Sequence, residues 1–193
     1  TERIAWGIDK AKNEDLFLKE KRIYELSQIE NGMPKVQPYQ IGFRLLTTLL
    51  QTYSGDIDAV IASLKDVKEE QKETLRRRCV CAWYWIKESA PDCAPDFCFT
   101  LREDGSKAED ISGEMLTAVR RVRDEVVPRL DTFAVDKECQ QAMYDIATEL
   151  GLESKALFTA LYHALIGKDQ GPRLASFFRI IGKEKLQKIL SVY

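Results

Sequence analysis

Apolar residues recur every three or four positions from Tyr39 onward, which is the spacing of one buried face of an α-helix. A break at 54–56 separates the first two predicted helices, with Asp56 as a new N-cap, and Asp66 is placed to cap a longer third helix. The residues expected to face inward in these helices are Leu45, Leu46, Leu49, Leu50 and Tyr53, then Ile57, Val60, Ile61 and Leu64, then Leu75, Cys79, Ala82, Trp83 and Ile86.

The helical spacing stops in an irregular stretch at 89–111 and returns at Ser112, which is expected to cap the next helix. Pro128 should end or bend that helix, because proline lacks the backbone N–H that a helix interior needs. A further helix is predicted between Asp136 and Gly151, with the glycine closing it as a C-cap.

The last forty residues predict three more helices. Ser154 is expected to cap the first, Gly167 to end it, and Gly182 to separate the remaining two. Pro172 suits the first turn of the second helix, because its missing N–H is unpaired there in any case. We find no strand pattern and no internal repeat, so the expected fold is all-α, an irregular bundle of about seven to nine helices.

The beginning of the chain has a different character. Residues 21–38 hold an Asn-Gly pair and two prolines, which are typical of turns and connectors, and the residues before them show only a weak helical pattern. We therefore divide the chain into a connector at 1–38 and a helical domain at 39–193.

Charge is distributed unevenly. The net charge is -2, but residues 155–193 hold seven Lys or Arg against two acids, so this segment is +5 and the remainder is -7. Phe158 and Tyr162 lie four residues apart on one helix face, with Lys155 one turn before them. Rings and cations together are typical of RNA binding, although core packing explains the two rings equally well.

Catalytic patterns are missing from the sequence. His163 is the single histidine, so any Ser-His-Asp or Cys-His site must use it, and its position within a helix is more typical of a surface or packing histidine. There is no Gly-rich nucleotide loop and no metal-binding helix motif.

The five cysteines are spaced poorly for zinc, because a two-residue separation on a helix directs the side chains apart and the other pair is separated by four residues. We expect reduced thiols and no metal. The cysteines are Cys79, Cys81, Cys93, Cys98 and Cys139.

The segment Leu157–Leu190 resembles the C-terminal end of class I lysyl-tRNA synthetases. The matching features are a helix ending in Leu-Ile-Gly, a short loop, Gly171-Pro172-Arg173, and an Ile-Gly-Lys-Glu turn before the last helix. Bacterial glutamyl-tRNA synthetases are the nearest alternative, but an acid more typically follows the Gly-Pro there. Upstream similarity extends to residue 22 and includes the aromatic run Cys-Ala-Trp-Tyr-Trp at 81–85.

The resemblance implies an α-helix cage that binds the anticodon stem-loop of tRNA(Lys). Family enzymes ligate lysine to tRNA with ATP and Mg²⁺ in a separate catalytic domain that bears HIGH and KMSKS signatures. Neither signature occurs here, so this chain is expected to contribute recognition without catalysis or a cofactor of its own. The implied partners are the tRNA and the catalytic domain of the same polypeptide, in the cytoplasm and away from membranes.

Within this resemblance, Lys168, Arg173 and Arg179 are candidates for neutralising phosphates, and Gly171 for a close backbone approach to RNA. The helix beginning at Pro172 would offer free N–H groups to a phosphate. Alternatively, the Gly-Pro-Arg turn is structural, with Arg173 paired to Asp169. The candidate RNA-binding residues are Lys155, Phe158, Tyr162, Lys168, Gly171, Arg173 and Arg179.

Two other classes of function stay open from the residues alone. A helical protein-interaction module without an RNA role would show scattered basic clusters, such as 76–78 and 120–123, and no contiguous basic groove. An independent enzyme would have to use His163 with cysteine thiols.

Overall fold

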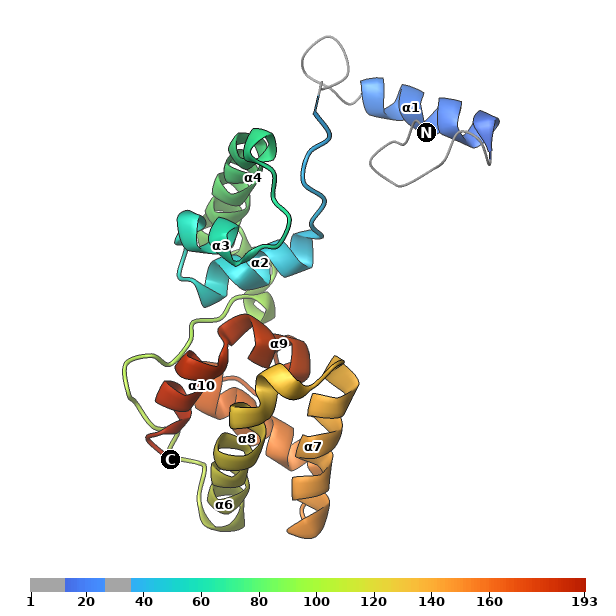
Figure 1. Ribbon diagram of the computed structural model, residues 1–193. Coiled ribbons are helices and arrows are strands. Elements are labelled where there is room, and N and C mark those ends of the chain that lie inside the picture. Colours follow the sequence, from blue (N-terminus) through green and yellow to red (C-terminus); the bar gives the residue numbers. More distant parts are fainter. Residues whose placement is uncertain (1–12, 27–35) are drawn as a thin grey trace.

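The computed structural model describes residues 13–26 and 36–193, and all regular secondary structure in them is helical (Figure 1). The all-α prediction is confirmed. The α-helices are α1 (Glu14–Leu26), α2 (Phe43–Thr52), α3 (Ile57–Ser63), α4 (Glu69–Glu88), α5 (Ala90–Cys93), α6 (Gly113–Arg121), α7 (Asp136–Glu149), α8 (Ser154–Ile166), α9 (Leu174–Ile181) and α10 (Lys183–Leu190).

The four-residue α5, which follows α4 directly, was not expected from the sequence. Helix α1 lies in the predicted connector, and most of it falls where the sequence showed only a weak helical pattern. Helix α1 continues to Leu26, so residues 21–26 are helical rather than a turn. The Asn-Gly pair and the first proline of that connector fall in 27–35, outside the described residues. The division at residue 38 stays a prediction.

A first hydrophobic core joins α2, α3 and α4. The short α3 begins where Asp56 accepts a hydrogen bond from Ala59 N at 3.0 Å, which confirms the predicted N-cap. The fully or nearly fully buried members of this core are Leu46, Leu49, Leu50, Val60, Ile61, Leu75, Cys79, Ala82 and Ile86. Leu45 is 45% exposed, because the buried stripe of the ten-residue α2 begins one position later.

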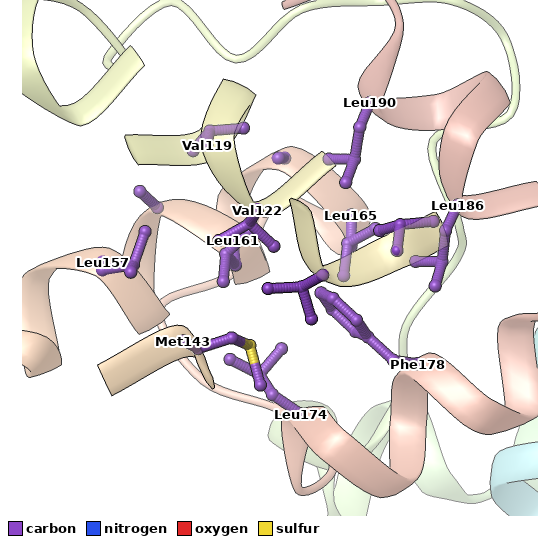
Figure 2. Close-up of a cluster of buried hydrophobic side chains, with 14 of the residues drawn as sticks. Val119, Val122, Met143, Leu157, Leu161, Leu165, Leu174, Phe178, Leu186 and Leu190 are labelled. Atoms are coloured by element: carbon purple, nitrogen blue, oxygen red, sulfur yellow. The ribbon is translucent and has the colours of Figure 1, made fainter. Parts of the chain in front are cut away.

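The second core joins α6 to α10 and is shown in Figure 2. Leu161 in the middle of α8 and Phe178 in α9 are both fully buried, and Leu186 and Leu190 reach the same core from α10 (Figure 2). Glycines in left-handed conformation end two of these helices. Gly167 closes α8 at φ 67°, as predicted, and its N–H bonds the carbonyls of the last turn.

Pro128 changes the helix that begins at Gly113, as predicted from the sequence. The α-helix gives way to a π-helical segment, Val122–Val126, and then to a 3₁₀ segment, Val127–Thr132. Because proline has no N–H to donate and crowds the preceding turn, the regular ladder cannot pass through it. The side chains of Val122, Val126 and Val127 nevertheless stay buried.

The expected cap at Asp66 is wrong. Asp66 adopts a left-handed conformation (φ 60°) in the turn before α4, and the helix begins three residues later at Glu69. Lys68 occupies the N-cap position, and its backbone N–H donates to the side chain of Gln71 at 3.2 Å. Similarly, α8 begins at Ser154 itself, with Glu153 in the cap position.

Residues 94–111 connect the two cores. Gln51 of α2 is almost completely buried, and its side-chain oxygen accepts the backbone N–H of Phe99 at 2.7 Å. The ring of Phe99 meets Phe177 of the second core edge to face, with centroids 5.2 Å apart. Ile180 of α9 packs against the first core. This connection holds the two groups of helices together and places the segment between them.

Candidate nucleic-acid interface

The two aromatic candidates on α8 face different neighbours. Phe158 packs against the ring of Tyr144 on α7, with centroids 5.0 Å apart. Tyr162 is half-buried, and its hydroxyl donates to the carbonyl oxygen of Pro172 at 2.7 Å. Burial raises the pKa of Tyr162. Both rings lie against the second core, so packing accounts for much of their surface, and RNA contact stays a prediction.

The Gly-Pro-Arg turn is shaped by Tyr162. A Cβ atom at Gly171 would lie 2.9 Å from Ile166 Cδ1 and 3.1 Å from the Tyr162 ring, so a larger residue here would have to displace these two side chains. Helix α9 begins at Leu174 with Arg173 as N-cap, so Pro172 lies before the first turn and not within it. The expectation of a helix starting at Pro172 is therefore wrong.

Arg173 is exposed, and no side-chain partner for it is found among the described residues. The alternative pairing with Asp169 is not formed. The carboxylate of Asp169 instead contacts Nε2 of His163 at 2.6 Å. The guanidinium of Arg173 is therefore available to bind an external anion.

The other candidate cations differ in how many hydrogen bonds and ion pairs they form within the protein. Arg179 is engaged twice, by Asp136 at 2.8 Å and by the carbonyl of Phe133 at 2.8 Å. Lys168 donates to the carbonyl of Pro95 at 2.8 Å, which leaves two of its three ammonium donors available. Lys155 is exposed.

Most arginines of the two basic clusters also have internal partners. Arg76 pairs with Asp58, and Arg78 donates to the carbonyls of Tyr39 and Ile41 at 2.8 and 2.9 Å. In the second cluster, Arg120 donates to the Tyr193 carbonyl, Arg121 pairs with Glu125 and Glu149, and Arg123 pairs with Asp124. The guanidinium groups of five of these six arginines are therefore engaged within the protein.

His163 lies between two carboxylates. Its Nδ1 contacts Asp110 and its Nε2 contacts Asp169 at 2.6 Å. Partial burial lowers the pKa of His163, but the hydrogen bonds that it donates to Asp169 and Asp110, together with the charges of these carboxylates, raise it by more, so the net shift is upward. A histidine that donates from both nitrogens is an imidazolium. Neither nitrogen is then free to deprotonate a nucleophile.

Two cavities differ in their charge. One, of about 430 Å³, is lined by Lys155 together with Asp110 and Glu153. The other, of about 540 Å³, lies between the two cores, and its lining includes Lys87 and Lys168 and, among the described residues, no carboxylate. An anion would be drawn to the second cavity.

Sequence reasoning missed the α4 wall of this second cavity. Trp83 was assigned to the core stripe, yet it is only half-buried and borders the cavity. Lys87 lies one helical turn further on, with its ammonium 5.2 Å from the centre of the Trp83 ring. An aromatic residue followed by lysine four positions later is a visible signal, but only the packing of α4 against 98–100 shows that a cavity lies there.

Comparison with known proteins identifies the class of domain. Residues 96–191 match the family model described as an anticodon binding domain, and this half of the chain belongs to that family. The matched range runs from the connecting segment through α10 and includes the second core.

The whole chain is similar to lysine–tRNA ligases. It is 50% identical to that of Treponema pallidum (strain Nichols), with 100% of this chain covered. The identity is 35% to the enzyme of Borreliella burgdorferi, over 100% of this chain, and 34% to that of Thermococcus kodakarensis, over 98%. The predicted resemblance to lysyl-tRNA synthetases is confirmed for an anticodon-binding region. The chain spans 36% of the length of each of these relatives.

None of the helices in the described ranges is both long and apolar enough to span a membrane.

Proposed function

We propose that this chain recognises the anticodon loop of tRNA(Lys) as part of a lysine–tRNA ligase. The observation that carries the proposal is the anticodon binding domain at 96–191 within a chain that is similar over its whole length to such ligases. The activity of the full enzyme, joining lysine to tRNA with ATP and Mg²⁺, would belong to the part of the ligase beyond this chain. A ligase of this kind acts in the cytoplasm.

The physical features support a loop-binding role. Bases in an RNA loop are unstacked and are commonly held by rings and cations rather than by a helix in a groove. The described residues offer exposed Arg173, partly free Lys168 and the cavity between the cores. Most other arginines are engaged within the protein, so phosphate attraction would be local and moderate.

Titration of the chain with a tRNA(Lys) anticodon stem-loop tests this proposal. The matched control is a stem-loop with the same stem and a scrambled loop. We expect tighter binding of the lysine loop and a fall in affinity with rising salt, by about 0.7 in the log–log slope for each single-strand phosphate contacted. Equal binding of both loops, or no binding, would contradict the proposal.

A helical protein-interaction module is the second candidate, and the internal pairing of the arginine clusters is the observation that favours it. The same titration separates the two, because such a module has no reason to distinguish the lysine loop from the scrambled one.

The second expected partner is the catalytic domain of the same ligase. Helix α1 supports this with four exposed apolar side chains, which a neighbouring domain would cover: Leu16, Leu18, Ile23 and Leu26. If it does, amide hydrogen exchange in α1 should be slower in the full ligase than in this chain alone. Equal exchange rates would place the contact elsewhere.

A further inference from the structure

The cavity of about 540 Å³ between the two cores has an aromatic wall on α4. Trp83 lies directly against the turn that precedes α3. A Cβ atom at Gly55 would come within 2.4 Å of Trp83 Cε2, and Gly55 has φ +85°. The positive φ and the lack of room for a Cβ atom both favour glycine at position 55. The indole of Trp83 therefore packs directly against the backbone of this turn. The ring is thus held in place at the edge of the cavity.

The facing wall comes from the connecting segment. The backbone of Phe99 is held by Gln51 of α2 through the 2.7 Å hydrogen bond, and its ring by the edge-to-face contact with Phe177. Cys98 lines the same wall. Both walls are therefore fixed by the fold before any ligand arrives, which lowers the entropic cost of binding.

The charge of the cavity comes from two lysines on different elements. Lys87 lies on α4, and Lys168 follows the C-terminal end of α8. Lys168 is held by the carbonyl of Pro95, while the exposed Lys87 contacts the Trp83 ring only through a cation–π interaction. Exposed contacts of this kind are weak, so Lys87 can leave the ring for a phosphate.

We propose that this cavity binds one unstacked nucleobase with its adjoining phosphate. The base would stack on the Trp83 indole and lie near Phe99, and the phosphate would meet Lys87 and Lys168. The volume lies within the roughly 300–1,000 Å³ typical of small-ligand sites. The proposal rests on the proposed function, since it assigns one nucleotide of the anticodon loop to a particular place.

Cysteine footprinting tests the location directly. Cys98 lines the cavity and is half-buried, whereas Cys81 and Cys93 are exposed and lie outside its lining. Alkylation by N-ethylmaleimide, followed by mass spectrometry, should slow at Cys98 when the tRNA(Lys) anticodon stem-loop is bound. The two exposed cysteines should react at the same rate with and without RNA.

Two pairs of variants test the chemistry. Lys87→Ala should flatten the salt dependence by up to about one unit, whereas Lys72→Ala, near the other end of α4, should leave it unchanged. Trp83→Leu should weaken binding by about five- to a hundredfold through loss of stacking, and Tyr84→Leu, at an exposed neighbour, should not.

The outcomes separate the two proposals. If the parent binds the stem-loop but Cys98 reacts unchanged and Lys87→Ala binds like the parent at every salt concentration, the cavity is not the site and the proposed function stands. If the parent does not bind the stem-loop, the proposed function fails and the cavity site fails with it. Should Trp83→Leu not fold, the footprint and Lys87→Ala still decide the result.

Discussion

Tyr162 offers the sharpest test of whether a predicted RNA contact is instead part of the protein's own packing. Tyr162→Phe removes only the hydroxyl that donates to Pro172 O at 2.7 Å. A neutral intramolecular hydrogen bond contributes about 0.5–1.5 kcal/mol, so we expect the free energy of unfolding to fall by about 1 kcal/mol. Tyr162→Ala also removes a half-buried ring that packs beside Gly171, and it leaves a gap next to Ile166. Full burial of an aromatic ring is worth about 3–5 kcal/mol in such truncations, so roughly half of that is expected here.

Urea unfolding of the parent and both variants measures these losses, and titration with the tRNA(Lys) stem-loop measures binding. Packing predicts that Tyr162→Phe binds RNA like the parent and that Tyr162→Ala loses stability as its main effect. Base stacking also predicts parental binding for Tyr162→Phe, which keeps the ring, but for Tyr162→Ala it predicts a loss of about 1–3 kcal/mol in binding with stability retained. If Tyr162→Ala is as stable as the parent and binds RNA poorly, the reasoning from its contacts is refuted.

Three further predictions concern the fold. The pKa of His163 is raised in the folded protein, so protonation of His163 adds to the free energy of unfolding. This contribution is fully present below the unfolded pKa of about 6.5 and is lost as the pH rises through the folded pKa. Urea unfolding between pH 5 and about 9 should show this decline in the parent and not in His163→Gln. Gly55→Ala should cost about 1–3 kcal/mol through its positive φ and its clash with Trp83. Gly42→Ala should cost less in the same assay, at most about 1 kcal/mol, because a Cβ there meets nothing within 4 Å and only the preference of the α2 N-cap for glycine is lost. Leu161→Ala should cost about 2–5 kcal/mol by thermal or urea unfolding, because the side chain is fully buried, and a loss below 1 kcal/mol would contradict its place in the core.

Local chemistry made much of the fold predictable from the sequence. Asp56 caps α3, Gly167 ends α8 and Pro128 interrupts its helix, because each outcome depends on a residue's own side chain and backbone. The cap at Asp66 failed for a related reason: an aspartate suits both a cap and a left-handed turn, and Asp66 takes the turn while Lys68 takes the cap position.

The candidate site was less predictable, because it depends on contacts between distant parts of the chain. The partner of His163 at Asp110 is 53 residues away, and the cavity joins residues of α4 to the segment after α8. A charge count identified Arg173 and Arg179 as equivalent cations, but only packing shows that Arg179 is held by Asp136 and Arg173 is not.

The hydrogen bonds of Gln51 have a consequence beyond joining the two cores. Its amide accepts from Phe99 N at 2.7 Å and donates to Phe97 O at 3.4 Å, two groups that flank Cys98 where the 3₁₀ segment Pro95–Phe97 ends. A single side chain therefore satisfies both a backbone donor and a backbone acceptor of the connecting segment. A residue at position 51 without an amide would leave both groups to find another partner, so this one position sets the backbone conformation of residues 97–99.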